Sequence, residues 1–497
     1  MNPGIKVDLV VPAAVPDLPH SLVFPLFEQE TLESTPWAAD ALRADVRDAV
    51  SRRELRGRLG ELYFTRGGSP AQRVIVVGLG PRDKESPEKW RRAAAAAALA
   101  ARGRGLARLA LVAPASSVAA RQAMVEGIQL ATLDADTYRT SPRDAMSLSE
   151  VVIAAEGNVD ATRAALERGR ILGIATNTAR ALANEPANLL SPLQLASRAA
   201  AIAGAAGLRV EVLAGGALSA RSMGLLLGVG RGSAEAPCLV DIRYDPEEAG
   251  DGPVLGLVGK GVTFDTGGIS IKAADGMEKM KYDMAGAAAV LGAMEAIAAL
   301  RPPVRVRGIV AAAENMPGGR AIRPGDVLRS ASGRTVEVNN TDAEGRLILG
   351  DALWYAREEA GATHLVDVAT LTGACVVALG RHASGLFAAN QAWGDLVREV
   401  ADASGDRVWP MPLHEDYAEQ LKSDIADVAN TGGRAGGAIT AAMFLEPFAG
   451  GMPWAHLDVA GTAWLDESKP WMPKGATGVM TRTLAGLALA HARIARP

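Results

Sequence analysis

Short apolar runs and helical stretches alternate along most of this chain. Near the N-terminus, an apolar run at Val74–Val77 precedes an Ala-rich stretch around 88–103 and a second apolar run at 109–113. Apolar runs of this length predict buried strands, and the Ala-rich stretch between them predicts a helix. Residues 1–165 are therefore predicted to form a small α/β domain.

A second series of strands and helices follows a long helical stretch at about 160–184. That stretch ends near Glu185-Pro186, and Pro192 closes the connection. Apolar runs then recur at 208–213, 254–258, 304–311, 364–368 and 455–459. Their alternation with Ala-rich helices predicts a mostly parallel sheet with helices on both faces. We expect residues 166–184 to link the N-terminal domain to a larger α/β domain at 185–497.

The glycine pair Gly78-Leu79-Gly80, directly after the first apolar run, has two interpretations. It is the beginning of a dinucleotide-binding fingerprint, or it is a turn at the end of a buried strand. The chain continues with Pro81-Arg82-Asp83, so the third glycine of the fingerprint is absent. The sequence therefore favours the plain turn.

Length and charge narrow the class of protein. A chain of 497 residues is long enough for two domains, and 48% hydrophobic with 22% charged residues is typical of a globular enzyme. A formal net charge of -4 argues against a specialist in binding polyanions. Residues 51–100 nevertheless carry 11 Lys and Arg against 5 Asp and Glu. This basic segment is either a solvated face or a contact for an acidic partner such as nucleic acid.

Cysteine usage and the N-terminus point to an intracellular protein. Cys238 and Cys375 lie in apolar surroundings, and two thiols are too few for a disulfide framework, so both are predicted to be core residues. The first twenty residues lack a basic start followed by a long apolar run, and no stretch of about 18 uninterrupted apolar residues occurs. We expect a cytoplasmic protein that does not span a membrane.

Charged residues follow several of the predicted strands. Lys260 and Asp265 come after the apolar run at 254–258, and Asp283 lies near the start of a predicted helix. Asp342 and Glu344 lie between a strand ending near Val338 and a helix beginning near Glu344. Residues two apart on a helix point away from each other, so these two carboxylates converge only if a turn holds them. The strand-to-helix junction supplies such a turn.

Four carboxylates in one cleft would repel each other and take up protons unless cations lay among them. Two divalent ions would balance the four charges, provided that Lys260 coordinates as a neutral amine. Such ligands suit Zn, Mn, Co or Mg. The six histidines are scattered without the spacing of a zinc site and are expected to be structural. Each acidic residue alone is more often a cap or a turn residue, so the prediction depends on their joint pattern.

The run Asn340-Thr341-Asp342-Ala343-Glu344-Gly345-Arg346-Leu347 resembles the signature of the leucyl aminopeptidase family of dinuclear metallopeptidases. Similarity extends through essentially all of 180–490, including VGKGVTFDTGGISIK (258–272), ENMP (314–317), RPGDVL (323–328), ATLTGACVVALG (369–380), SDIADVAN (423–430), GGRAGGAITAAMFL (432–445) and PWAHLDVAGTAW (453–464). The N-terminal domain is only loosely similar. Asn339 is a departure, since many relatives have an apolar residue before the signature.

The resemblance implies roles for particular residues. The tightly held metal would be bound by Lys260, Asp265, Asp283 and Glu344, and the more exchangeable metal by Asp265, Asp342 and Glu344. Manganese and zinc are the metals that we expect. Lys272 would polarise the scissile carbonyl, and Arg346 would hold a bicarbonate ion that acts as general base. Positions that match the family's pocket for the first side chain are Met280, Thr370, Leu371, Gly373 and Ala460.

The resemblance thus implies an aminopeptidase that releases N-terminal Leu- or Met-like residues from peptides with a broad preference, and that assembles as a homohexamer. Two other hypotheses remain open. The first is an additional DNA-binding regulatory role through the basic N-terminal domain. The second is a catalytically dead structural relative, which the presence of all seven metal and catalytic residues disfavours.

Overall fold

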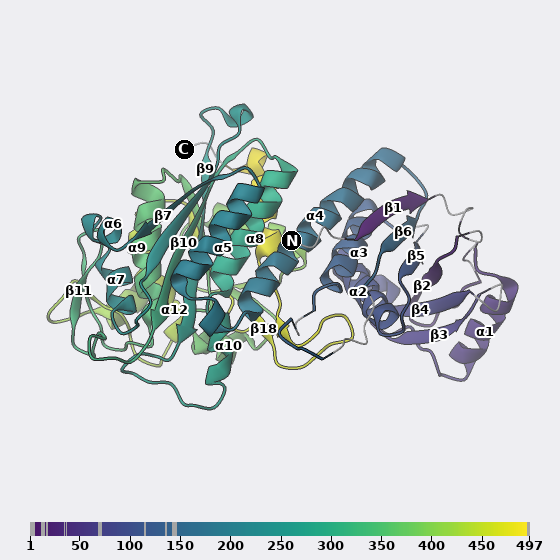
Figure 1. Ribbon diagram of the computed structural model, residues 1–497, viewed down its shortest axis with the longest axis horizontal. Coiled ribbons are helices and arrows are strands. Elements are labelled where there is room, and N and C mark those ends of the chain that lie inside the picture. Colours follow the sequence, from purple (N-terminus) through teal and green to yellow (C-terminus); the bar gives the residue numbers. More distant parts are fainter. Residues whose placement is uncertain are drawn as a thin grey trace. The chain divides into compact units, whose positions relative to one another are not determined.

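The computed structural model describes residues 5–10, 15, 18–33, 35, 37–67, 72–113, 116–134, 137–141 and 147–494. Its chain divides into two units, the first formed by Met1–Asn177 with Asp466–Lys474 and the second by Thr178–Leu465 with Gly475–Pro497. Figure 1 shows that each unit combines a sheet with helices. The predicted α/β class is therefore confirmed.

The first unit contains a six-stranded sheet in the order β1-β6-β5-β2-β4-β3, parallel except for the antiparallel pair β3 and β4. Its strands are β1 (Lys6–Val10), β2 (Ser21–Phe27), β3 (Leu62–Arg66), β4 (Arg73–Gly80), β5 (Arg108–Val112) and β6 (Glu150–Ala154). Its helical elements are α1 (Asp40–Ser51), η2 (Arg82–Lys84), α2 (Pro87–Arg102), α3 (Val118–Leu130) and most of α4 (Val159–Asn184). The predicted strands and helices in this part of the chain are confirmed.

The segment that forms β4 is apolar without interruption because both faces of its sheet are covered. Ile75 and Val77 belong to one hydrophobic core, while Val74 and Val76 belong to a second core on the opposite face of the sheet. Successive side chains of a strand point to opposite faces, so a sheet covered on both sides needs apolar residues at every position. The strand continues to Gly80, where φ is +79° and a 3-10 turn follows, as expected of a plain glycine turn.

The second unit contains an eight-stranded sheet in the order β15-β14-β17-β13-β9-β10-β8-β7. Its strands are β7 (Arg209–Ala214), β8 (Cys238–Tyr244), β9 (Val254–Asp265), β10 (Arg305–Asn315), β13 (His364–Ala369), β14 (Ser384–Ala388), β15 (Val408–Pro410) and β17 (Trp454–Asp458). The four central strands β17, β13, β9 and β10 are parallel, whereas β8, β7 and β14 add antiparallel pairs toward the edges. The centre of the sheet is thus parallel, as predicted.

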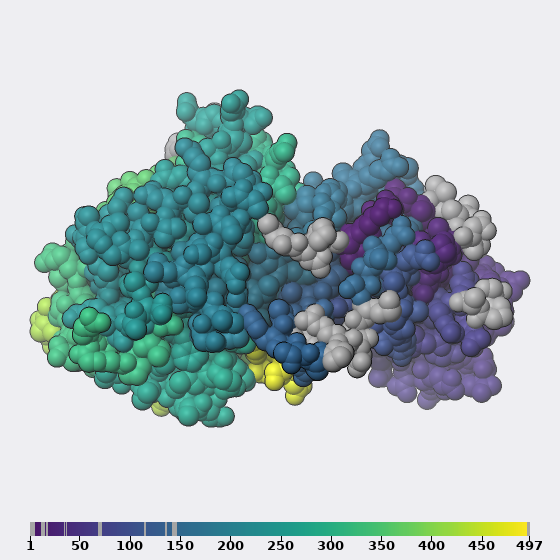
Figure 2. Space-filling view, in the orientation of Figure 1, coloured from purple at the N-terminus to yellow at the C-terminus, as the bar shows by residue number. Residues whose placement is uncertain are grey.

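Helices cover both faces of this sheet. One face carries α5 (Pro192–Ala205), α8 (Ala285–Leu300), α11 (Gln391–Ser404) and α13 (Thr481–Leu489); the other carries α7 (Gly224–Gly230), α9 (Glu344–Glu358) and α12 (Gly437–Ala449). Helices α5 and α8 lie side by side in Figure 1. In Figure 2, teal, the colour of residues near 200, covers much of the surface of this unit in the same view. The central strands are consequently buried on both faces.

Smaller elements complete the second unit. A three-stranded sheet and a two-stranded sheet contain β11 (Val327–Arg329), β12 (Thr335–Glu337), β16 (Val428–Ala429), β18 (Trp464–Leu465) and β19 (Gly475–Ala476). The remaining helical elements are η3 (Ala187–Leu189), α6 (Gly216–Ala220), η4 (Glu247–Ala249), η5 (Met277–Tyr282), α10 (Gly373–Leu379), η6 (Glu415–Leu421) and η7 (His491–Arg493). Cys238 and Cys375 are buried free thiols, which confirms their predicted place in the core.

One helical stretch, Met277–Leu300, is long and apolar enough to cross a membrane by length and composition alone, with a mean hydropathy of 1.5. Within its most apolar window, 72% of the residues are buried inside the protein. A helix that is apolar on all sides and packed on all sides is the ordinary core helix of a large protein. The apolar composition of this stretch is therefore explained by its packing against the sheet.

Candidate functional site

The candidate site lies where the parallel strands of the second unit end. Asp265 is the last residue of β9 and pairs in register with Asn315, the last residue of β10. Next to them, β13 ends at Ala369 and β17 ends at Asp458, which pair with each other. Carboxyl ends of parallel strands lie at one edge of a sheet, so polar side chains from distant parts of the chain meet there.

Strand β9 is longer than the sequence indicated, and its irregularity is important. We predicted a strand at 254–258 with Lys260 after its end, but β9 continues to Asp265 and Lys260 lies within it. The pairing with β10 shifts between Ala313 and Glu314, so that Thr263 is an additional residue in β9. In a regular strand, Lys260 and Asp265 would point to opposite faces because they are five residues apart. The bulge at Thr263 lets both side chains reach the same cleft.

Asp283 lies at a break between two helices. The sequence predicted one helix for this stretch, with Asp283 near its start; the structure has the 3-10 helix η5 to Tyr282 and the α-helix α8 from Ala285. Behind Asp283, the backbone of α8 approaches the sheet very closely. A Cβ atom on Gly286 would be 2.0 Å from the carbonyl oxygen of Val368 and 3.1 Å from the backbone nitrogen of Lys260. Glycine is the residue that allows this approach.

Asp342 and Glu344 are held by the predicted turn. Asn340 Oδ1 accepts a hydrogen bond from the backbone nitrogen of Asp342 at 2.9 Å, and α9 begins at Glu344. Asn430 Oδ1 accepts hydrogen bonds from the backbone nitrogens of Asn339 and Asn340 at 2.8 and 3.2 Å, while its Nδ2 donates to the carbonyl of Asn340 at 2.7 Å. The side chain of Asn339 is exposed, so this departure from the family pattern does not disturb the packing.

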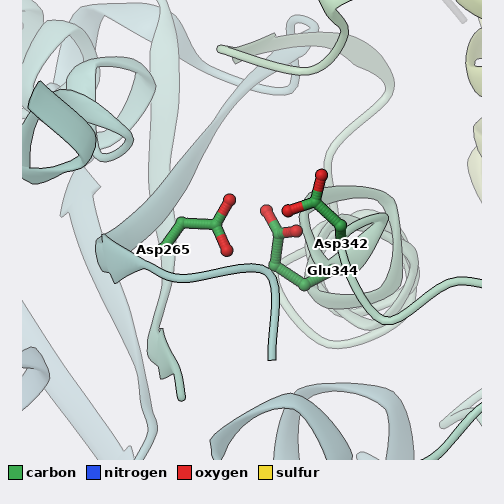
Figure 3. Close-up of side chains that lie close together, drawn as sticks. All are labelled: Asp265, Asp342 and Glu344. Carbon is green, nitrogen blue, oxygen red and sulfur yellow. The ribbon is translucent and has the colours of Figure 1, made fainter. Parts of the chain in front are cut away.

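The carboxylates of Asp265, Asp342 and Glu344 converge. Figure 3 shows the three side chains pointing toward one another, and one oxygen atom of each lies within 4.8 Å of the others. Asn315 Nδ2 and the backbone nitrogen of Gly267 donate to Asp265 Oδ1 at 2.8 and 2.9 Å, which fixes the orientation of that carboxylate. The sequence match at 314–317 included Asn315, but no role was predicted for it.

Two lysines lie among these carboxylates. Lys260 Nζ is 2.8 Å from both Asp283 Oδ2 and Glu344 Oε1, and it donates to the carbonyl oxygen of Thr370 at 2.8 Å. Lys272 Nζ is 2.8 Å from Asp265 Oδ2 and 2.5 Å from Asp342 Oδ1. Burial opposes the charge on each lysine, yet the surrounding carboxylates raise the pKa of both above the usual range. This geometry therefore favours charged lysines, and a neutral Lys260 requires a competing cation.

The carboxylates favour further positive charge. Burial raises the pKa of Asp283 well above its usual range, and Glu344 adds to the rise although Lys260 opposes it. Burial also raises the pKa values of Asp342 and Glu344. Among the described residues, no hydrogen-bond donor reaches the buried Glu344 Oε2 atom. Carboxylate oxygens that are buried, close together and incompletely paired fit divalent cations.

Arg346 lies in the first turn of α9, beside this cluster. It is buried, and its Nη1 atom donates to the carbonyl oxygen of Asn430 at 2.7 Å. Burial lowers the pKa of Arg346 to about 10. Its Nε atom is buried and has no hydrogen-bond partner within the part of the chain that the structure describes. A buried guanidinium with a spare donor can bind a small anion.

All twelve residues predicted for the site line one cleft with a volume of about 940 Å³. Beyond the carboxylates, Lys272 and Arg346, the cleft includes Met280, Thr370, Leu371, Gly373 and Ala460. None of the six histidines lines it. No role was predicted from the sequence for several further lining residues, among them Thr372, Met411 and Ile439, although Thr372 and Ile439 lie within segments that resemble the family.

Family models match most of the chain. The model of the cytosol aminopeptidase family, catalytic domain, matches residues 177–485, and the model of its N-terminal domain matches residues 23–142. A probable cytosol aminopeptidase of Solibacter usitatus (strain Ellin6076) is 53% identical over 424 residues, which cover 85% of this chain and 88% of that protein. A probable cytosol aminopeptidase of Koribacter versatilis (strain Ellin345) is 44% identical over 472 residues, or 90% and 92% of the two chains.

Solved structures have the same fold. A mutant of tomato leucine aminopeptidase superposes with a TM-score of 0.88 at 33% sequence identity, covering 98% of this chain and 97% of that chain. The bottromycin maturation enzyme BotP in complex with Mn has a TM-score of 0.85 at 36% identity, covering 95% of this chain and 99% of that chain. The similarity thus includes both units of the protein.

Proposed function

The chain belongs to the cytosol aminopeptidase family and is a peptidase of the hydrolase class, and we propose that it releases N-terminal residues from peptides with two divalent metal ions. The observation that carries this proposal is the convergence of Asp265, Asp342 and Glu344 within 4.8 Å, with Lys260 and Asp283 beside them. The four carboxylates come from three separate segments, and the ammonium groups of Lys260 and Lys272 balance only two of their four charges, which favours further cations.

We propose that the more tightly held ion is bound by Lys260, Asp265, Asp283 and Glu344, and the more exchangeable ion by Asp265, Asp342 and Glu344. Two ions in this position would supply a hydroxide nucleophile at neutral pH, since they lower the pKa of bound water. Manganese and zinc are the preferred candidates. The manganese complex of the related BotP structure supports a divalent metal in this family.

Lys272 and Arg346 are the proposed catalytic groups that do not bind metal. Lys272 Nζ lies between Asp265 and Asp342 at the cleft, where an ammonium could donate a hydrogen bond to the oxygen of the scissile carbonyl. The guanidinium of Arg346 could hold bicarbonate in reach of the same place. Arg346 would thereby place a general base in a cleft that none of the six histidines lines.

The side chain of the released residue would occupy the part of the cleft formed by Met280, Thr370, Leu371, Gly373 and Ala460. An apolar wall with small neighbours favours Leu- or Met-like side chains. One methylene group changes binding by only about 1–3 kcal/mol, so the preference should be broad. We further propose peptides as the substrates, a homohexameric assembly and a cytoplasmic location, as the resemblance to this family implies.

A DNA-binding role is not favoured by the contacts of the basic segment. Arg52 pairs with Asp48, Arg82 with Glu30, and Arg91 and Arg92 with Glu88, so carboxylates balance at least four of the eleven basic side chains in this segment. Binding to DNA phosphates requires basic side chains that are free to replace counterions. The relatives described above also carry only peptidase or maturation-enzyme names.

Metal removal tests the proposed function. Dialysis of the purified protein against a chelator should abolish hydrolysis of leucinamide, and added Mn²⁺ or Zn²⁺ should restore it. Full hydrolysis by protein whose metal content is zero by mass spectrometry would contradict the two-metal proposal. Activity that returns with neither ion would contradict the proposed metals.

A further inference from the structure

Asp458 is a buried carboxylate at the end of β17 that lines no part of the cleft. Its Oδ1 atom accepts hydrogen bonds from the backbone nitrogens of Leu371 at 3.3 Å and Ala460 at 3.1 Å. Its Oδ2 atom accepts a hydrogen bond from Thr372 Oγ1 at 2.7 Å. One carboxylate therefore ties together two loops that follow different strands.

Both of these loops form the wall of the cleft. Leu371 and Ala460 lie in the part that we assign to the first side chain of the substrate. Thr372 Oγ1 also accepts a hydrogen bond from the backbone nitrogen of Cys375 at 3.0 Å and so caps α10. The position of α10, whose residues line the outer cleft, thus depends on the same group.

The loop held by Asp458 also contacts two proposed metal ligands. The carbonyl oxygen of Thr370 accepts a hydrogen bond from Lys260 Nζ at 2.8 Å, and Thr370 Oγ1 donates to Asp283 Oδ1 at 2.6 Å. Thr370 is the residue next to Leu371, so a shift of the loop would move both contacts.

A charged carboxylate is costly at this position, because burial disfavours its charge. Among the residues that the structure describes, no lysine or arginine forms a salt bridge with Asp458, and three neutral donors alone hold it. Desolvation of a charge without an ionic partner is unfavourable. Asp458 and Glu344 are the carboxylates whose charge supports the buried guanidinium of Arg346.

We propose that Asp458 is a positioning residue that fixes the loop Thr370–Gly373 against Ala460, and so sets the wall of the substrate pocket together with the places of Lys260 and Asp283. The assignment of the pocket rests on the proposed aminopeptidase function. The hydrogen-bond network of Asp458 does not rest on that function, so the positioning role and the aminopeptidase function can be tested separately.

The test compares Asp458→Ala and Asp458→Asn with a matched control, Asp406→Asn. Asp406 is also a buried carboxylate that does not line the cleft. It accepts hydrogen bonds from the backbone nitrogen of Met480 at 3.2 Å and from Thr483 Oγ1 at 2.8 Å, and unlike Asp458 it also pairs with Arg482 at 3.3 Å. Hydrogen exchange followed by mass spectrometry reports on segments 369–376 and 457–462. Steady-state hydrolysis of leucinamide and alaninamide reports on pocket selectivity.

Asp458→Ala should speed amide exchange in both segments by about tenfold or more, because it removes the acceptor of Leu371 and Ala460. It should also lower the ratio of kcat/KM for leucinamide over alaninamide, with Asp458→Asn in between because an amide oxygen still accepts. Asp406→Asn should leave both readouts as in the wild type. Wild-type exchange and an unchanged ratio in Asp458→Ala would overturn the proposal.

Should Asp458→Ala fail to fold, Asp458→Asn and Thr372→Ala decide the question by the same two readouts. Thr372→Ala removes one of the three donors and should give a smaller increase in exchange; exchange as in the wild type in both variants overturns the proposal. A wild-type protein that hydrolyses neither amide contradicts the proposed function, while the exchange data still test the positioning role.

Discussion

Replacement of Gly286 by alanine tests how the close contact between α8 and the sheet supports the site. The added Cβ atom would meet the Val368 carbonyl oxygen at 2.0 Å, where ordinary contacts begin near 3.4 Å. The first turn of α8 must therefore retreat by roughly 1.4 Å, since protein interiors have no free space to absorb the overlap. Because the obstacle is backbone, we expect a cost of about 3 kcal/mol, the upper end of typical overpacking.

The same retreat would displace Asp283, which precedes α8 and lies 2.8 Å from Lys260 Nζ. A misplacement of about 1 Å in a catalytic site can lower the rate by about a hundredfold. We therefore expect Gly286→Ala to reduce kcat/KM for leucinamide by about that factor. Its thermal unfolding midpoint should fall by about 6 °C, at about 2 °C per kcal/mol for a unit of this size.

Gly204→Ala is the matched control. Gly204 lies in the exposed face of α5, and a Cβ atom there would meet nothing within 4 Å. Alanine should stabilise that helix by up to about 1 kcal/mol, and activity should not change. Differential scanning calorimetry and steady-state kinetics measure both effects. A Gly286→Ala variant with a wild-type midpoint and wild-type activity would refute the reasoning.

Three further predictions concern the site and the core. Glu344→Gln should weaken Mn²⁺ binding in titration calorimetry by more than the 10- to 100-fold typical of residues that only orient ligands, and retention of two ions would contradict its role as a ligand. Lys272→Met should lower kcat for leucinamide by about 10²- to 10³-fold while the ions remain bound, and an effect confined to KM would argue for substrate binding instead. Burial raises the pKa of both Cys238 and Cys375 to about 12. Neither thiol should react with a disulfide reagent at pH 8 in the native protein, although both should react in urea; rapid native labelling would contradict their burial.

The sequence predicted the site well where chemistry and local geometry coincide. Asp342 and Glu344 were placed at a strand-to-helix junction because only a turn brings residues two apart together, and α9 does begin at Glu344. The small residues after Asp283 predicted close packing, and Gly286 provides it. The position of these carboxylates where buried strands end predicted that they share one cleft, and charge balance then made two metal ions plausible there.

Other features could not be predicted because the sequence carries no signal for them. Strand β9 is buried on both faces, so it lacks the alternation of polar and apolar residues that would reveal a bulge or the place of Lys260. The break at Asp283 was hidden because η5 and α8 are both helical in composition. Asn315, Asn430 and Asp458 act through contacts with residues distant in the chain, and no local pattern marks such partners.

The extra residue in β9 makes the length of this strand as important as its composition. A chain that lost Thr263 would pair β9 and β10 without interruption, and by the rules of strand geometry it would be the more regular sheet. Phe264 and Asp265 would keep their partners Glu314 and Asn315, and Lys260 and Asp265, then four residues apart in a regular strand, would still point to one face. One added residue without a second bulge would instead turn Asp265 to the opposite face, so homologues should tolerate the loss of one residue between Lys260 and Asp265 more readily than the gain of one.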